Sequence, residues 1–492
     1  MDNILTYLTQ GGDPAACGVY PRSEHATAQG ARVFMAACGG ADYLIAPASA
    51  GFSGEAFQAG GQAYCKAPLS HENAKKLRAL FPFTAPSPVL GQARTFGVGD
   101  RLGIAGPGHI RVFEAYDAYP VFAQQSIREL SLTGRDFGQV LDCATFAVFR
   151  EDFTRPWGAD GDHLKTPAEI ELALSNGYTM ITLDCSEHIR NDVGAMTDAA
   201  VLAACPASPA LEKRYLGPAR RIEGYSLQFD RVSLARMQLV YGGAIAFAAD
   251  MYARYFAGRS HAPDFEISID ETATPTEPAQ HYFVADQLLL RGVNIATLAP
   301  RFCGEFQKGV DYRGDLGQFE KEFAIHAAIA RHFGYKLSVH SGSDKFSVFP
   351  IVGTYTQGRF HVKTAGTNWL EAMRVIALRE PGLYREIHAF ALETAFEEAR
   401  KYYHVTTDLS KIPALDSLSD DRLPGLFEQD DARQLIHITY GLILGAKNPD
   451  GTYRFRGRLY AAWRAYSEEY AQRLKGHIGK HMELLYSGFE SR

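Results

Sequence analysis

Ionisable side chains share one face of several short segments that have the alternating pattern of β-strands. In FEISIDET (265–272), Glu266 and Asp270 lie opposite a phenylalanine and two isoleucines, because successive side chains of a strand point to opposite faces. The same alternation sets His340 in KLSVHS and Lys363 in FHVKT opposite apolar residues. Buried charges are costly unless they are paired or bound to a metal. The three polar faces therefore predict one internal site; the alternative is that these strands leave that face open to solvent.

Two histidines are the favoured candidates for metal ligands. His340 ends one of these strands, and His163 lies in WGADGDHLKT (157–166), which we predict to be a Gly-rich loop after a strand. With an oxygen donor, two imidazoles suit Mn, Ni, Zn or Co. The alternative for the loop is a solvated turn in which Thr166 caps a helix that begins with proline. That explanation accounts for Thr166 but not for Asp162 beside His163.

Eight strand candidates alternate with longer helical stretches from about residue 95 onward. This rhythm is typical of a (β/α)8 TIM-type barrel, and a doubly wound open sheet is the alternative. In a barrel, the chemistry lies at the carboxyl ends of the strands and in the loops that follow them. The predicted strand segments are 101–105, 121–126, 140–149, 178–188, 265–272, 293–302, 336–344 and 359–367.

The chain is predicted to have three parts. Residues 1–92 mix short apolar runs with glycine and alanine and form an α/β appendage. Residues 93–380 form the catalytic barrel, in which the long gap at 189–264 holds an insertion. Residues 381–492 show only helical spacing and form a helical extension packed on the barrel.

Composition excludes several classes of function. The 492 residues are 46% hydrophobic, which is ample for a large core, and the net charge of −6 argues against nucleic acid or an anionic membrane as partner. The N-terminus has neither a basic region nor a long apolar region, and we expect a cytoplasmic protein. Seven scattered cysteines form no CxxC pair, and no phosphate-loop, zincin, hydrolase or dinucleotide motif is present. Self-association into a homo-oligomer is compatible with this composition.

Six segments together resemble the tagaturonate epimerase family, and the likeness covers about residues 95–380. They are FAQQSIREL, WGADGDHLKT, EISIDET, APRFCGEFQKGVDY, SVHSGSDKFS and HVKTAGT. The resemblance implies interconversion of D-tagaturonate and D-fructuronate, two small sugar acids, with a divalent metal cation.

The carbon inverted in that reaction is one step beyond the carbon next to the ketone, and enolisation does not acidify it. Two routes could invert it: retro-aldol cleavage followed by aldol closure, or transient oxidation with a hydride acceptor. No dinucleotide fingerprint is present, so we favour the retro-aldol route. It needs a Lewis acid on the ketone and a base for the hydroxyl proton.

The resemblance and this chemistry together suggest roles for particular residues. Asp162 is the predicted base and Glu266 the second acid/base, with Asp270 in reserve. A cation must hold the substrate carboxylate, and a Schiff base is a competing use of Lys363 or Lys345. The predicted metal ligands are His163, His340 and one of Glu305 and Gln307. The candidate cations are Lys165, Arg301, Lys345 and Lys363.

Rival functions fit the same pattern. A metal-dependent aldolase or ketose isomerase would use the same kind of barrel and metal. A non-catalytic sugar-acid-binding protein would bind the ligand without turnover, but a binding site does not need charges so deep in a barrel.

Overall fold

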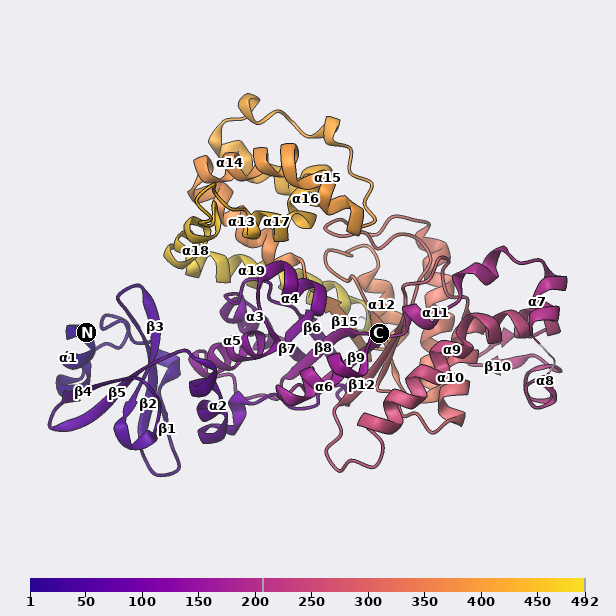
Figure 1. Cartoon of the computed structure of the whole chain (residues 1–492), viewed down its shortest axis with the longest axis horizontal. Helices are drawn as coiled ribbons and strands as arrows, with labels where there is room; N and C mark the ends of the chain where they lie inside the picture. The colour runs from indigo at the N-terminus through magenta and orange to yellow at the C-terminus, as the bar shows by residue number, and fades with distance from the viewer. Residues whose placement is uncertain (206–207, 491–492) are drawn as a thin grey trace.

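A closed barrel of eight parallel strands forms the centre of the molecule (Figure 1). The computed structural model describes residues 1–205 and 208–490. Each barrel strand pairs in parallel with its neighbours along the chain, and the last strand pairs with the first. The predicted TIM-type barrel is therefore confirmed. The strands are β6 (Arg94–Val98), β7 (Tyr119–Ser126), β8 (Gly158–Leu164), β9 (Met180–Asp184), β12 (Asp264–Ile269), β13 (Thr297–Pro300), β14 (Lys336–Val339) and β15 (Phe360–Thr364).

Two of the eight predicted strand positions were wrong. Residues 101–105 form the bend that leads into α3 (Gly106–Phe113), and the first strand is β6, just upstream. Residues 140–149 lie inside α5 (Phe137–Arg150), where Asp136 makes a capping box with Gln139. An apolar run rich in β-branched and aromatic residues is compatible with either a strand or a buried helix. Here the capping box stabilises the start of a helix.

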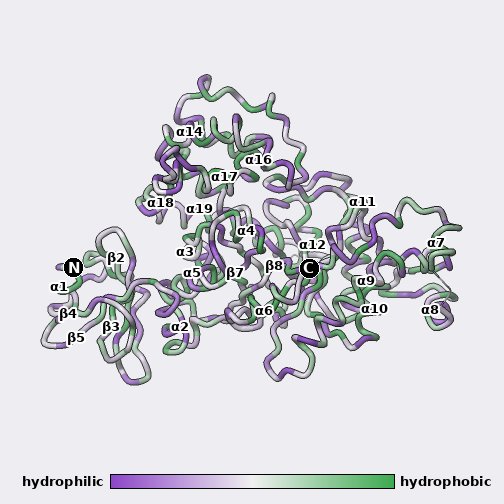
Figure 2. The backbone as a smooth tube through the Cα atoms, viewed as in Figure 1, coloured by the Kyte–Doolittle hydropathy of each residue, from purple (hydrophilic) through white to green (hydrophobic). Residues whose placement is uncertain are grey.

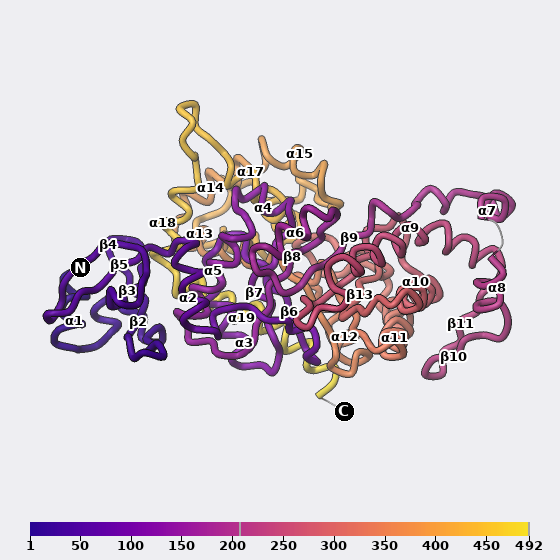
Figure 3. Tube along the Cα trace, turned by 60° about the horizontal axis from the view of Figure 1, so that its bottom comes forward, coloured from indigo at the N-terminus to yellow at the C-terminus, as the bar shows by residue number. Residues whose placement is uncertain are grey.

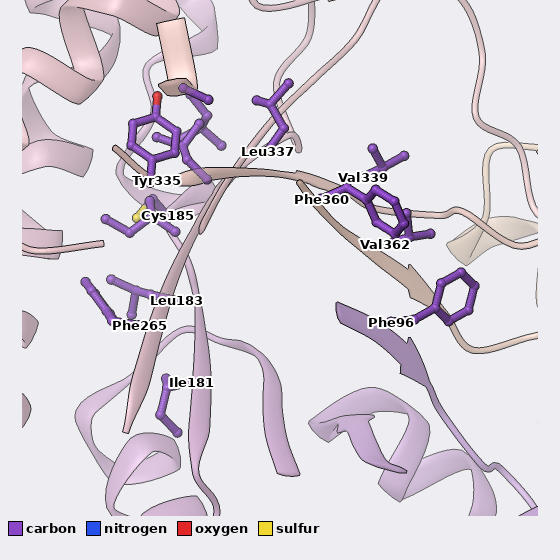
Figure 4. Close-up of a cluster of buried hydrophobic side chains, with 14 of the residues drawn as sticks. Phe96, Ile181, Leu183, Cys185, Phe265, Tyr335, Leu337, Val339, Phe360 and Val362 are labelled. Carbon is purple, nitrogen blue, oxygen red and sulfur yellow. The ribbon is translucent and has the colours of Figure 1, made fainter. Parts of the chain in front are cut away.

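The apolar faces of the strands point outward to the helix layer, as predicted. Figure 4 shows Leu337 and Val339 of β14, and Phe360 and Val362 of β15, among the buried hydrophobic side chains. The opposite faces of these strands carry Ser338, histidine and lysine side chains, which are buried in the barrel interior. The interior is therefore polar, whereas barrel interiors are usually filled with branched apolar residues.

Helices surround the barrel on its outer side. Helix α9 (Arg231–Tyr255) is the one helix in the described part of the chain that is long and apolar enough to cross a membrane, and Figure 2 shows its hydrophobic stretch. It packs on α7 (Asp198–Ala204) and α10 as part of the helix layer, with Tyr241 and Ile245 buried in the main core. The other surrounding helices are α4 (Ile127–Thr133), α6 (Pro167–Ser175), α10 (Pro278–Leu290), α11 (Leu316–Phe333) and α12 (Phe349–Thr356).

The residues before the barrel form an antiparallel sheet with strand order β1-β2-β3-β5-β4, at the left of Figure 1. Helices α1 (Asp2–Gln10) and α2 (His71–Leu80) accompany it, and α2 packs on α5 of the barrel. The predicted insertion at 189–264 contains α7, α8 (Pro209–Tyr215), α9 and a small hairpin. The sheet strands are β1 (His25–Ala26), β2 (Arg32–Cys38), β3 (Ala41–Pro47), β4 (Glu55–Ala59) and β5 (Gln62–Pro68), and the hairpin strands are β10 (Arg220–Ile222) and β11 (Tyr225–Leu227).

A helical region with its own core follows the barrel, and it begins with the helix after β15. The last helix, α19 (Ser467–Glu490), returns to the barrel and packs along α3 and α12 (Figures 1 and 3). Glycines allow this close approach: a Cβ on Gly353 would lie 1.9 Å from the Leu485 carbonyl oxygen. The remaining helices of this region are α13 (Thr367–Arg379), α14 (Pro381–Phe390), α15 (Phe396–Ala399), α16 (Asp430–Ile438), α17 (Tyr440–Gly445) and α18 (Arg456–Ala465).

Candidate active site

A cavity of about 770 Å³ opens at the carboxyl ends of the barrel strands. This is the end at which barrel enzymes carry out their chemistry. The C-terminal helical region contributes Tyr402, Tyr403 and His404 to its wall. Of the ten predicted site residues, Glu266 and Lys345 do not line the cavity. The eight that do are Asp162, His163, Lys165, Arg301, Glu305, Gln307, His340 and Lys363.

The segment predicted as a Gly-rich loop is strand β8, and an irregularity in it positions two functional side chains. Its pairing with β9 shifts register between Gly161 and Leu164, and His163 has a φ of 54°, in the left-handed region that non-glycine residues rarely adopt. Strict alternation would send Asp162 and His163 to opposite faces. The irregularity instead brings both to the cavity.

Three side chains, one in β8 and two that directly follow β12 and β14, converge as a possible metal site. The imidazole rings of His163 and His340 lie 4.9 Å apart between centroids, and ligand atoms of both histidines and Asp270 lie within 4.8 Å of one another. A carboxylate binds one nitrogen of each ring: Asp162 Oδ1 is 2.8 Å from His163 Nδ1, and Glu266 Oε1 is 2.8 Å from His340 Nε2. Carboxylates hold metal-ligating histidines in this way.

The remaining ring nitrogens are the ones that a metal would use. His340 Nδ1 lies 3.2 Å from Asp270 Oδ2, and it is buried without a hydrogen bond to any described residue. His163 keeps Nε2 available, because its Nδ1 is bound to Asp162. Two imidazole nitrogens and a carboxylate oxygen form a donor set that suits a first-row divalent ion.

A buried lysine connects the carboxylates beneath this site. Lys363 Nζ lies 2.7 Å from Asp160 Oδ2, 2.6 Å from Asp162 Oδ1 and 3.0 Å from Glu266 Oε1. Thr182 donates its hydroxyl to Asp160 and Glu266. Three carboxylates contact this one ammonium group and Asp270 faces His340, so the centre accommodates additional positive charge.

The pKa shifts in the cluster reflect that balance. Burial acts to lower the pKa of His163, but the carboxylate of Asp162 outweighs it and raises the pKa to about 10. Burial also opposes a charged His340, and Asp270 with Glu266 raises its pKa above the usual value. For Asp160, burial dominates and raises the pKa to about 7. Positive charge is therefore favoured at the two imidazoles.

The sequence model of the tagaturonate epimerase family matches residues 26–485, which is most of the chain. The chain belongs to the tagaturonate epimerase family. A tagaturonate/fructuronate epimerase of Thermotoga maritima is 44% identical over 420 residues, which are 85% of each chain. The native crystal structure of fructuronate-tagaturonate epimerase UxaE from Cohnella laeviribosi is 50% identical, covers 96% of this chain and 98% of that one, and superposes with a TM-score of 0.92. The protein is therefore an isomerase of the epimerase type.

Two predicted metal ligands of this epimerase lie apart from the histidine pair. Glu305 pairs with His404, whose Nε2 is 3.3 Å from Glu305 Oε2. The Gln307 side-chain oxygen accepts hydrogen bonds from Thr406 and Gln434, so it fastens the C-terminal region to the loop after β13. The structure instead groups the reserve residue Asp270 with the two histidines.

Three of the four predicted cations are already engaged. Lys363 contacts the three carboxylates, and Lys165 Nζ lies 3.4 Å from Asp184 Oδ2. Lys345 is fully buried and donates to the carbonyl oxygens of residues 307, 310 and 343. Arg301 donates to the Thr272 carbonyl and makes no ion pair with a described residue. A Schiff-base role for Lys363 or Lys345 would require breaking these contacts.

Sequence reasoning missed several residues of this epimerase's site. Asp160 has the same parity as Asp162 and would have been found if residues 157–166 had been taken as a strand. Lys308 and Arg101 also line the cavity. Neither lies in a strand with alternating polarity, so no periodic signal marks them.

Proposed function

We propose that this epimerase interconverts D-tagaturonate and D-fructuronate with a divalent metal held by His163, Asp270 and His340. The observation that carries the proposal is the convergence of these three side chains at the cavity, with each imidazole oriented by a carboxylate. The names of the relatives supply the substrate pair. When bound, a divalent ion supplies Lewis acidity toward the ketone and stabilises developing negative charge.

We assign to Asp162 the removal of the hydroxyl proton at the inverted carbon. Its Oδ1 is engaged by His163 and Lys363, whereas Oδ2 makes no hydrogen bond with a described residue and the side chain lines the cavity. Burial would raise its pKa, but Lys363 and His163 outweigh burial and hold the pKa well below the usual range, so Asp162 stays ionised. An ionised carboxylate with one open oxygen can accept a proton from a bound hydroxyl.

The retro-aldol step balances as follows. The hydroxyl loses its proton to Asp162 and becomes an aldehyde, and the electron pair of the carbon–carbon bond passes to the fragment that carries the ketone, which becomes an enediolate. The aldehyde then rotates so that its opposite face meets the enediolate. The carbon–carbon bond re-forms on that face, and Asp162 returns the proton to the new hydroxyl. No redox partner is consumed.

Glu266 supports this chemistry from one layer below the cavity. It is fully buried; Oε1 accepts from His340, Lys363 and Thr182, and Oε2 accepts from Thr297. Both oxygens are therefore occupied. We propose that Glu266 orients His340 rather than exchanging protons with the substrate.

We also propose a cytoplasmic location and a small sugar acid as the only substrate class, without a nucleic acid or membrane partner. The seven cysteines are free thiols, which suits a reducing compartment. Formation of a homo-oligomer stays a prediction from the sequence.

Ketohexuronate epimerisation before and after chelation tests the proposal. Activity should disappear on chelation and return with one of Mn, Ni, Zn or Co; full activity in a demonstrably metal-free preparation would refute metal dependence. Substrate deuterated at the inverted carbon should give product that retains the label in ordinary water. Complete washout would refute the retro-aldol route, and transfer of the label to a nicotinamide would favour the redox route.

A further inference from the structure

One lysine in the cavity has no carboxylate partner. Lys308 Nζ lies 3.1 Å from Ser341 Oγ, and no carboxylate of the described residues lies within 4.0 Å of it. The other cavity lysines, Lys165 and Lys363, are both neutralised by acidic side chains. A lysine held within a protein without a counterion is costly, which indicates that an anion is missing from its surroundings.

Two further side chains of this cavity, an arginine and a histidine, have nitrogen atoms without hydrogen-bond partners among the described residues. Arg101 is 2% exposed; its guanidinium pairs with Glu129 at 2.7 Å and stacks over Tyr440, but Nη1 makes no hydrogen bond with a described residue. His437 is 1% exposed, and both of its ring nitrogens lack partners. Both side chains line the same cavity as Lys308. Buried polar groups without partners are rare in native proteins, and a bound ion or a role in the reaction is among their explanations.

The position of these groups relates them to the candidate metal site. Ser341 directly follows His340, so the hydroxyl that contacts Lys308 belongs to the residue next to a proposed ligand. Gly366, at the start of α13, also lines the cavity, and a Cβ there would lie 1.8 Å from His437 Nε2. The positive end of the α13 dipole thus adds to the attraction for an anion. A substrate anchored here would extend toward the histidine pair.

We propose that Lys308 and Ser341 bind the carboxylate of the sugar acid, with Arg101 Nη1 as a further donor. The assignment rests on the proposed function and deepens it, because it names the end of the substrate that this part of the cavity recognises. Lys308 supplies the net charge, since Arg101 is already neutralised by Glu129. Charge-assisted hydrogen bonds of this kind are the strong ones.

The anchor has a consequence for the retro-aldol route. Cleavage leaves the carboxylate on the aldehyde fragment, which must turn its face without leaving the cavity. Lys308 and Ser341 would hold the carboxylate end of that fragment while the aldehyde end rotates.

Arg301 is the alternative anchor, because it also has no ion pair among the described residues. Its guanidinium, however, donates to the Thr272 carbonyl, and its main chain exchanges hydrogen bonds with Thr276. These contacts fasten the loop after β12 to the end of β13. Arg301 therefore has a structural function that Lys308 lacks.

The test measures both catalysis of the ketohexuronate and calorimetric binding of a non-reacting six-carbon aldonate. Lys308→Met should raise KM and the aldonate Kd by about 10- to 100-fold, with a smaller change in kcat. The reason is that loss of a charged hydrogen bond weakens the binding of the substrate and of the transition state to a similar extent. Lys308→Arg should recover most of the binding. Arg128→Met is the matched control: it removes an exposed cation of the same cavity, one that binds the Tyr402 carbonyl.

The outcomes separate the two proposals. If the wild-type enzyme does not epimerise ketohexuronates with any metal, the proposed function is wrong. If the wild-type enzyme is active but Lys308→Met binds the aldonate as tightly as wild type, the assignment of Lys308 as the carboxylate anchor is wrong. A selective loss of aldonate binding in Arg301→Met would then identify Arg301 as the anchor. Equal losses in Lys308→Met and Arg128→Met would indicate only a general field effect and would also overturn the assignment. Melting temperature and metal content, measured on every variant, identify any loss that comes from misfolding.

Discussion

Replacement of Glu266 by glutamine distinguishes a residue that orients a metal ligand from one that exchanges protons. A glutamine oxygen can still accept from His340, Lys363 and Thr182 at the position of Oε1, and its amide can donate to Thr297 at the position of Oε2. The shape of the site is kept and only the negative charge is lost. Lys363 retains Asp160 and Asp162 as partners.

The magnitudes follow from those contacts. Removal of an outer partner of a metal-ligating histidine costs about 10- to 100-fold in metal affinity, or about 1.4–2.7 kcal/mol. Leaving a buried charge unpaired costs about 3–5 kcal/mol in unfolding free energy. The loss in this variant should be smaller, because Lys363 keeps two carboxylate partners. At saturating metal, kcat should remain close to that of wild type.

Metal affinity is measured by competition with a chelator, and kcat is measured across a metal titration. Thr297→Val is the control, since it removes a hydroxyl 2.5 Å from Glu266 Oε2 and leaves the charge in place; it should weaken metal binding less. A kcat lower by about 10²- to 10⁴-fold with normal metal content would refute this reasoning. That result would restore the acid/base role expected from the sequence.

Three other perturbations have definite expected outcomes. Asp162→Asn should lower kcat by about 10²- to 10⁴-fold with protein still folded by circular dichroism; near-normal turnover would remove Asp162 as the base. Burial opposes a charged His477, but Asp344 raises its pKa above 6.5, so the stabilisation it gives is complete below pH 6.5 and is lost as the pH rises through the folded-state pKa. The melting-temperature difference between wild type and His477→Gln should accordingly shrink with rising pH, and a constant difference would contradict this. Gly366→Ala should cost about 1–3 kcal/mol in denaturant unfolding because it overpacks His437, whereas Gly476→Ala, with open space around it on helix α19, should stabilise by up to about 1 kcal/mol; similar values for the two would refute the packing argument.

The sequence predicted the parts of the fold that depend on local periodicity. Alternation in β12, β14 and β15 separates apolar from ionisable residues, and the structure has those two faces as expected. The predicted N-cap at Thr166 is confirmed. In the Thr-Pro-x-Glu pattern, the Thr and Glu side chains accept hydrogen bonds from free backbone N–H groups at the start of the same helix. These features are determined within a few residues of chain.

The errors arose where distant contacts override the local pattern. Residues 157–166 contain two glycines and were predicted to be a loop, but both Gly158 and Gly161 are strand residues, and a Cβ on either would collide with neighbouring side chains. Glycine there permits close packing around β8 rather than a turn. Lys308, which has no carboxylate partner among the described residues, and Asp160 of the carboxylate cluster were missed for the same reason. Their significance depends on which strands become neighbours when the barrel closes.

Because α19 completes the helix layer around the barrel, the barrel strands are synthesised before the helix that covers part of them. At the seam where β15 meets β6, Phe96 shares the main core with Ile478, Met482 and Leu485 of α19, which packs along α3 and α12. A nascent chain that has emerged with all eight strands but without α19 still exposes this apolar seam to solvent and to chaperones, because α19 lies well downstream of β15 in the sequence. The helix layer is therefore complete only once α19 has been made, and a chain that lacks α19 would keep its barrel strands yet expose an apolar surface that promotes aggregation.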